Sequence, residues 1–280
     1  MEVRLKYSQS IFIHPGLPEL ILHEWQPEKA VKAVMLLVHG LGEHAGRYGD
    51  DFADFYTDSG VVILAPDLPG HGKTPGPRGH IADTNQFLDY LDTLIAKARA
   101  AFPGKPLFLY GHSLGGGIVL WYTLTRQPQV NGVIVTSPVI GTRIPVPALK
   151  VWLASVMNSL FPSFTMDNGL DVQQLSRDKN IVQAYINDPL VHKLVSARLG
   201  KLILEFAAII PAQAHKNQAN ILLMVGSEEG IVDRNAIQTF SKITPRVDYK
   251  EWPGLYHEIH NEPEKENVFN FTITWMEKFF

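Results

Sequence analysis

The chain has 280 residues, of which 45% are hydrophobic and 19% charged, with a formal net charge of -3. This apolar content suffices for a large core and excludes a disordered or collagen-like chain, while the scattered Lys and Arg argue against a nucleic-acid partner. Because the sequence contains no cysteine, a disulfide framework, a thiolate nucleophile and a cysteine-based metal site are also excluded.

The first residues contain no long apolar run and no small-residue cleavage site, so they do not resemble a signal peptide. No stretch of the sequence reaches the roughly 20 consecutive apolar residues that span a bilayer. We therefore expect a cytoplasmic protein that does not cross a membrane.

Strand-like and helix-like segments alternate through the first half of the chain. Two short segments are interpreted as antiparallel strands at the start, at residues 11–13 and 20–25. Four apolar, β-branched-rich runs then predict strands buried on both faces, at residues 31–38, 61–65, 106–110 and 132–136. Three helical patterns separate these runs, at residues 48–58, 85–101 and 114–126. This alternation predicts a parallel sheet with right-handed crossovers.

A loop containing two glycines, His-Gly-Leu-Gly-Glu-His, follows the strand predicted at residues 31–38. Glycines allow the backbone of such a loop to approach a bound ligand closely, and its amides could then serve as hydrogen-bond donors. An ordinary strand-to-helix turn is the alternative. The choice depends on whether a nucleophile follows in the chain.

Residues 111–115, Gly-His-Ser-Leu-Gly, match the nucleophile elbow Gly-x-Ser-x-Gly. The context is the required one, because a predicted strand precedes the motif and a predicted helix follows it. A phosphate-binding loop is disfavoured, because no lysine follows the glycines. We predict that Ser113 is the nucleophile and that the amides of Leu41 and Leu114 form an oxyanion hole.

The alternation stops after residue 139, and residues 141–218 show helical patterns without a convincing strand. We interpret residues 141–218 as a helical cap inserted into a core formed by residues 1–140 and 219–280. Apolar residues are dense at 146–164. They are expected to pack on the core or line an acyl tunnel, with contact to a membrane surface as the alternative.

The run at residues 221–225 predicts a further strand, and three acidic residues follow it. Glu229 is the preferred partner for a catalytic histidine by its position. Asp233 directly precedes the helix predicted at residues 234–242 and fits its N-cap, yet it stays the alternative acid. Glu228 is expected to be solvated.

A serine on such an elbow takes its acid and then its histidine later in the chain. Of the four histidines that follow Ser113, we choose His257, because it lies in a loop after the strand-like residues 247–252. The pair His257 and His260 is three residues apart in a loop, whereas zinc-binding histidines of metalloproteases are four apart on a helix. We expect neither a metal nor a cofactor.

Together these motifs resemble the monoacylglycerol lipases and lysophospholipases of the α/β-hydrolase superfamily. The matching segments cover nearly the whole chain in order, at residues 39–44, 46–48, 67–72, 111–116, 175–178, 187–190 and 254–258. The resemblance implies an α/β-hydrolase fold: a mostly parallel eight-stranded sheet flanked by helices, with an inserted helical cap.

The resemblance also implies a serine hydrolase that cleaves monoacylglycerols to fatty acid and glycerol through an acyl-enzyme on Ser113, with His257 as the base. A lysophospholipase or a general carboxylesterase on the same triad is the alternative, and a binding module without catalysis is an alternative of another class. Where the family usually has Gly-x-x-Asp, this chain has Glu229. Glutamate is one methylene longer than aspartate, so either its carboxylate must be oriented differently or Asp233 must take the role of the acid.

The expected partner is a small acyl ester, bound by residues of the first loop, the elbow and the cap. These candidate substrate-binding residues are Gly40, Glu43, His112, Tyr185 and Asn187.

Overall fold

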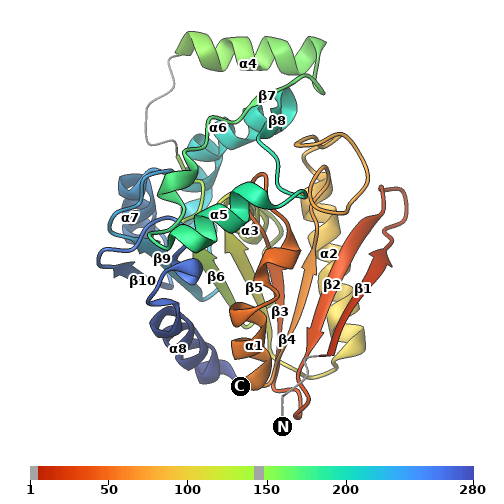
Figure 1. The fold of residues 1–280 in the computed structure, drawn as a ribbon, viewed down its shortest axis with the longest axis vertical. Coiled ribbons are helices and arrows are strands. Elements are labelled where there is room, and N and C mark those ends of the chain that lie inside the picture. Colours follow the sequence, from red (N-terminus) through yellow and green to blue (C-terminus); the bar gives the residue numbers. More distant parts are fainter. Residues whose placement is uncertain (1–5, 142–147) are drawn as a thin grey trace.

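A computed structural model describes residues 6–141 and 148–280. Its main feature is an eight-stranded sheet in the order β1-β2-β4-β3-β5-β6-β9-β10 (Figure 1). The strands are β1 (Lys6–Phe12), β2 (Leu20–Gln26), β3 (Ala33–Val38), β4 (Val61–Pro66), β5 (Leu107–His112), β6 (Gly132–Thr136), β9 (Ile221–Gly226) and β10 (Val247–Trp252). Among these eight strands, only β1 with β2 and β2 with β4 pair antiparallel. The predicted mostly parallel eight-stranded sheet is confirmed.

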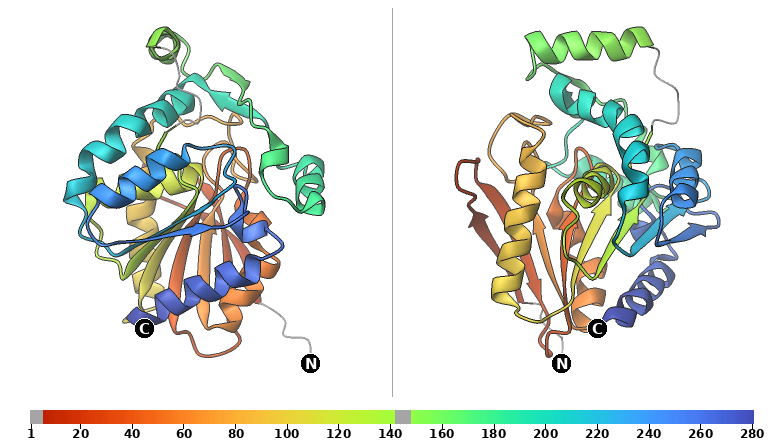
Figure 2. Two further views of the ribbon diagram at one scale, coloured as in Figure 1. Left: turned by 90° about the vertical axis from the view of Figure 1, so that its left-hand side faces the viewer. Right: turned by 180° about the vertical axis from the view of Figure 1, so that it is seen from behind.

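Helices cover both faces of this sheet (Figures 1 and 2). The α-helices are α1 (Asp51–Asp58), α2 (Gln86–Ala101), α3 (Leu114–Arg126), α4 (Ala148–Leu160), α5 (Lys179–Asn187), α6 (Ala197–Gln213), α7 (Arg234–Ile243) and α8 (Lys265–Met276). Short 3-10 helices are η1 (Ala45–Tyr48), η2 (Val172–Gln174), η3 (Ala214–Lys216), η4 (Ile259–Asn261) and η5 (Glu277–Phe279).

Each central strand contributes to two separate cores, because successive side chains of a strand point to opposite faces. In β3, Leu36 packs into the core that contains residues of α2, α3, α6 and α7. Its neighbour Leu37 packs into the core formed with α1 and α8. Burial on both faces explains why these strands are continuous apolar runs in the sequence.

The segment predicted as a cap lies between β6 and β9 and contains α4, α5 and α6. It also contains a short antiparallel pair, β7 (Thr165–Asp167) with β8 (Leu194–Ser196), which the sequence analysis did not expect. α6 packs against α3, and its buried Leu199 and Phe206 belong to the sheet core. One helix of the predicted cap is therefore part of the main packing, and the division at residues 141 and 218 stays a prediction.

α4 lies on the outer side of α6, far from the sheet (Figure 1). The expectation that residues 146–164 pack on the core or line a tunnel is wrong for six large side chains. These are 46–66% exposed: Leu149, Trp152, Leu153, Leu160, Phe161 and Phe164. The reason is geometric, since α4 packs mainly against α6 and buries mainly the side that faces it. Val146 lies outside the described residues, and none of the helices within them is both long and apolar enough to cross a membrane.

Two glycines in helices predict opposite effects of the same substitution. A Cβ on Gly115 in α3 would lie 2.0 Å from the carbonyl oxygen of Val38, whereas on Gly200 in α6 its nearest neighbour would be 3.8 Å away. We expect Gly115→Ala to lower the free energy of unfolding by at least about 2 kcal/mol through overpacking. Gly200→Ala should raise it by about 0.5–1 kcal/mol through helix propensity. Urea unfolding measures both, and equal effects of the two substitutions would contradict the packing described here.

Candidate active site

Ser113 lies on a strained turn between β5 and α3. Its φ of 53° and ψ of -115° are unfavourable for a residue with a Cβ. Two backbone hydrogen bonds hold this turn: the Ser113 N–H donates to the Thr136 carbonyl at 3.0 Å, and the Val139 N–H donates to the Ser113 carbonyl at 3.0 Å. The geometry is that of a nucleophile elbow.

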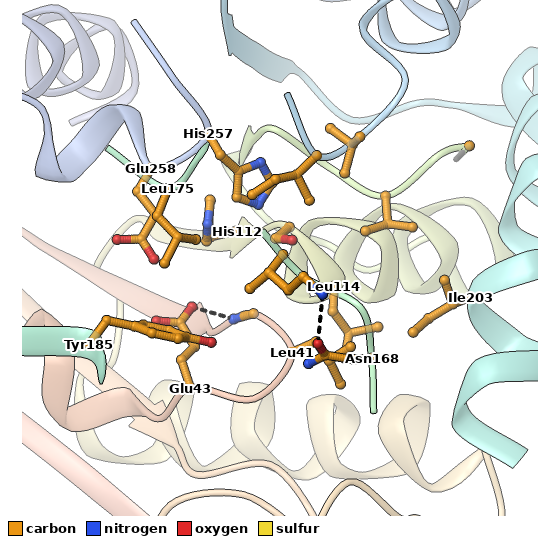
Figure 3. Close-up of a pocket in the computed structure, with 17 residues that line it drawn as sticks. Leu41, Glu43, His112, Leu114, Asn168, Leu175, Tyr185, Ile203, His257 and Glu258 are labelled. Carbon is orange, nitrogen blue, oxygen red and sulfur yellow. Dashed lines mark hydrogen bonds between the residues drawn. The ribbon is translucent and has the colours of Figure 1, made fainter. Parts of the chain in front are cut away.

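Ser113 lines a cavity of about 180 Å³ at the carboxyl edge of the sheet. Figure 3 shows Glu43, Tyr185 and Glu258 together on one side of this cavity and Ile203 on the opposite side. The apolar lining includes Leu41, Val139, Leu170, Ile203, Ile231 and Val232. The cavity therefore has one end with three polar side chains, where Leu175 also lies, and an apolar end at Ile203, which we call the polar end and the apolar end.

His257 lies on the same cavity and contacts Glu229 through its Nδ1. The two carboxylate oxygens lie 2.8 and 3.0 Å from Nδ1. Glu229 Oε1 also accepts hydrogen bonds from the N–H groups of Ile231 at 2.8 Å and Val232 at 3.1 Å. These two amides orient the carboxylate, so the extra methylene of glutamate is accommodated.

Charge stabilisation shifts the pKa values of both partners. Burial alone would raise the pKa of the Glu229 carboxyl, but His257 and the two N–H donors outweigh it and the pKa is lowered. Burial alone would lower the pKa of His257, but the Glu229 carboxylate outweighs it and the pKa is raised. This pair therefore favours a charged imidazolium.

The other two acidic residues after β9, Asp233 and Glu228, take no part in the contact between Glu229 and His257. Asp233 Oδ1 accepts from the N–H groups of Asn235 at 2.9 Å and Ala236 at 3.1 Å, which is the N-cap geometry of α7. No hydrogen bond in residues 6–141 and 148–280 joins Asp233 to His257. Glu228 is exposed.

The loop that follows β3 packs directly against Ser113. A Cβ on Gly40 would lie 3.3 Å from Ser113 Cβ. The Gly40 N–H donates to Glu43 Oε1 at 2.6 Å, and His39 accepts at Nε2 from the Leu68 N–H at 2.9 Å. The remaining proton of neutral His39 is then on Nδ1, which donates to the Gly40 carbonyl at 2.8 Å. The side chains of this loop and its neighbours thus fix its backbone.

Two amides beside Ser113 are free to donate. Within the described part of the chain, neither the Leu41 N–H nor the Leu114 N–H donates to another group of the protein. Leu114 is the first residue of α3, where N–H groups have no partner inside the helix. Both residues line the cavity, so their amides could bind a negatively charged oxygen there.

A buried ionic cluster lies beneath the polar end of the cavity. Arg47 donates two hydrogen bonds of 2.8 Å to Glu258 and a further one to Glu43, and its guanidinium lies 4.7 Å from the ring centre of Tyr185. Burial raises the pKa of Glu258, but Arg47 outweighs it and keeps the carboxyl ionised. Neither Arg47 nor Glu258 was among the predicted site residues, although both belong to segments that carry the resemblance.

Four of the five predicted substrate-binding residues line the cavity, namely Gly40, Glu43, His112 and Tyr185. Asn187 does not; it is exposed and accepts a hydrogen bond from Gln183 at 2.9 Å. Two helix positions correspond to a rotation of about 200°, so the helix that buries Tyr185 turns Asn187 away. Asn168, in the loop after β7, lines the cavity instead, and no motif in the sequence indicated it.

The chain matches a protein-family model described as serine aminopeptidase, S33, over residues 29–264. It is 34% identical to phospholipase YtpA of Bacillus subtilis, over 88% of this chain and 95% of that protein. It is 30% identical to a monoacylglycerol lipase of Mycolicibacterium smegmatis, over 96% of both chains. Among solved structures, a monoacylglycerol lipase of Paleococcus ferrophilus is similar with a TM-score of 0.85 and 32% identity, covering 93% of this chain and 99% of that one.

The contact between Glu229 and His257 predicts a change in the pKa of the imidazole. In Glu229→Gln the pKa of His257 should fall, because burial remains while the carboxylate that offsets it is removed. Asp233→Asn should leave it unchanged. Histidine-selective NMR titration measures both, with His257→Gln to identify the signal. A larger fall in Asp233→Asn would transfer the acid role to Asp233.

Proposed function

Because the chain belongs to the serine aminopeptidase S33 family of α/β-hydrolases, within the monoacylglycerol lipases, we propose that it hydrolyses monoacylglycerols to fatty acid and glycerol. One observation carries this proposal. A serine on a strained elbow shares a cavity with a histidine whose Nδ1 contacts a buried carboxylate at 2.8 Å. The two chemically different ends of that cavity match an ester with an apolar acyl chain and a polar alcohol.

The reaction proceeds through an acyl-enzyme. His257 Nε2 takes the proton of Ser113 as its Oγ attacks the ester carbonyl, and the amides of Leu41 and Leu114 bind the oxyanion. The imidazolium then protonates the departing glycerol oxygen. In the second half, His257 activates water, which attacks the acyl-enzyme and releases the fatty acid with Ser113 regenerated.

Glu229 determines which nitrogen of His257 is available. Since the carboxylate accepts the proton on Nδ1, Nε2 is left without one and can serve as the base. The imidazolium that forms lies near three carboxylates, of which Glu43 and Glu258 also raise the pKa of His257. Their charge stabilises the positive imidazole during both half-reactions.

The two ends of the cavity bind different parts of the substrate. The apolar end, towards Ile203, takes the acyl chain, because burial of each CH2 contributes about 0.8 kcal/mol. The glycerol lies at the polar end, where Glu43 accepts and Tyr185 donates hydrogen bonds, with Gly40 and His112 as the walls.

A lysophospholipase is the second candidate, favoured by the identity to phospholipase YtpA. At the polar end the carboxylates of Glu43 and Glu258 share the single guanidinium of Arg47, so the net charge is negative. A negative net charge disfavours binding of a phosphate group.

Residues 141–218 serve as the cap over a core of residues 1–140 and 219–280, and the outer side of the cap rests on a lipid surface. Support comes from exposed large apolar side chains gathered on α4 and the loop that follows it: Leu149, Trp152, Leu153, Leu160, Phe161 and Phe164. Solvent-exposed apolar patches on this scale are typical of interaction surfaces. A substrate drawn from a membrane or micelle would enter near this side.

The proposed nucleophile predicts complete loss of turnover in Ser113→Ala. Monoacylglycerol hydrolysis, followed by release of fatty acid, should fall by at least about 10³-fold, and labelling by a fluorophosphonate should disappear. Ser241→Ala, a partly buried serine of α7, is the control. Retained turnover in Ser113→Ala would refute the mechanism, and faster hydrolysis of lysophosphatidylcholine than of a monoacylglycerol with the same acyl chain would favour the second candidate.

The exposed side of α4 predicts binding to lipid vesicles. The double variant Trp152→Ser, Phe161→Ser should bind phosphatidylcholine vesicles at least about tenfold more weakly, because two large apolar side chains no longer enter the bilayer surface. Hydrolysis of 4-nitrophenyl acetate, which needs no membrane, should not change. Ile11→Ser removes an equally exposed side chain from β1 and is the matched control. Equal flotation of all three proteins with vesicles would contradict a lipid-binding role for α4.

A further inference from the structure

The backbone of His257 is held on both sides by distant parts of the chain. Its N–H donates to the carbonyl of Gln174 at 3.3 Å, and its carbonyl accepts from Ser137 Oγ at 2.9 Å. The next N–H, that of Glu258, donates to the carbonyl of Leu175 at 2.8 Å, and the two residues lie close together in Figure 3. The loop that carries the proposed base is therefore built against residues 174–175 of the predicted cap.

Glu262 joins the same two segments through its carboxylate. Oε1 accepts from the Tyr256 N–H at 2.8 Å and from the Arg177 N–H at 3.3 Å, and Oε2 accepts from Arg177 Nε at 2.9 Å. Tyr256 directly precedes His257. One side chain thus ties the residue before the base to the residues that follow Gln174 and Leu175 in the cap.

The burial of Glu262 argues that its role is more than general stability. Its side chain is fully buried, so the carboxylate has lost its hydration and depends on these donors. Its partner Arg177 is 35% exposed, so only the carboxylate side of this ion pair is buried. A buried carboxylate often adds little to stability compared with an apolar residue of the same volume, but its donors must stay in place to satisfy it. Here those groups belong to the loop of the base and to the cap.

Resting on the function proposed above, we propose that Glu262 is a positioning residue for His257, so that turnover depends on how residues 174–177 of the cap seat against the loop of the base. Proton transfer from Ser113 requires His257 Nε2 at hydrogen-bond distance, and displacements of about 1 Å can cost on the order of 100-fold in rate. Without the Glu262 carboxylate, Tyr256 and Arg177 lose the acceptor that they share, so the position of the neighbouring His257 is less well defined.

The chain offers a matched control for this proposal. Glu264 also pairs with Arg177, but its side chain is 44% exposed, and in the described ranges it has no hydrogen bond to residues 256–258. Removing Glu264 takes a charge away from the same arginine without touching the loop of the base. Any effect specific to Glu262 therefore reports on the link to His257.

The experiment compares Glu262→Ala, Glu262→Gln, Arg177→Met and Glu264→Ala, using a monoacylglycerol and 4-nitrophenyl acetate well below the melting temperature of each protein. We expect kcat in Glu262→Ala to fall about tenfold or more on both esters, with KM within about twofold. Glu262→Gln should retain more activity, because its amide oxygen can still accept from Tyr256 and Arg177. Arg177→Met should lower kcat, and Glu264→Ala should leave it unchanged.

Two results would overturn the proposal. One is a lower melting temperature of Glu262→Ala with an unchanged kcat, which would make the residue purely structural. The other is an equal loss in Glu264→Ala, which would assign the effect to the charge of Arg177. If Glu262→Ala does not fold, unchanged kcat in both Glu262→Gln and Arg177→Met overturns it. Failure of the monoacylglycerol as substrate would refute the proposed function alone, because 4-nitrophenyl acetate still reports on His257.

Discussion

The close approach of α3 to the end of β3 is the constraint on which the site depends. A Cβ on Gly115 would lie within 2.5 Å of the carbonyl oxygens of both Val38 and His39, so only glycine permits this contact. The contact brings the first turn of α3 against the loop that starts at His39. Ser113, the free amide of Leu114 and the free amide of Leu41 then face one cavity. The strain at Ser113 is the local cost of this arrangement, which the backbone hydrogen bonds to β6 and to Val139 maintain.

A second constraint is that several charges are buried close to this turn. Each carboxylate there has an identified set of donors: Glu229 has His257 and two amides, Glu43 has Gly40, Tyr48 and Arg47, and Glu258 has Arg47 and Asn261. Buried charges require such compensation. Because one arginine serves two of the carboxylates, the region keeps an excess of negative charge. That excess favours protonation of His257 and a neutral polar ligand at the cavity.

The sheet and the elbow could be predicted because short, continuous stretches of sequence determine them. Strands buried on both faces are continuous apolar runs, and Gly-x-Ser-x-Gly between a strand and a helix has few other uses. Asp233 as a helix cap could likewise be inferred from its position before the helix. The orientation of Glu229 could not, since it depends on the amides of Ile231 and Val232. The pair β7 and β8 was missed because three-residue strands carry no periodic signal. The exposure of α4 was missed because an apolar pattern does not indicate which partner covers it.

The segment inserted between β6 and β9 is more closely joined to the core than the word cap implies. α6 contributes Phe206 to the sheet core, where its ring would clash with any Cβ added to Gly117 of α3. Residues 174–177 hydrogen-bond to the loop of His257 and to Glu262. Within the described residues of this segment, most of the exposed large apolar side chains lie on α4 and the loop after it. A rigid displacement of the whole segment would therefore break core packing and move the base, whereas a displacement of α4 would disturb neither. If substrate entry requires motion, α4 is the element that can move, while α6 and residues 174–177 stay with the site.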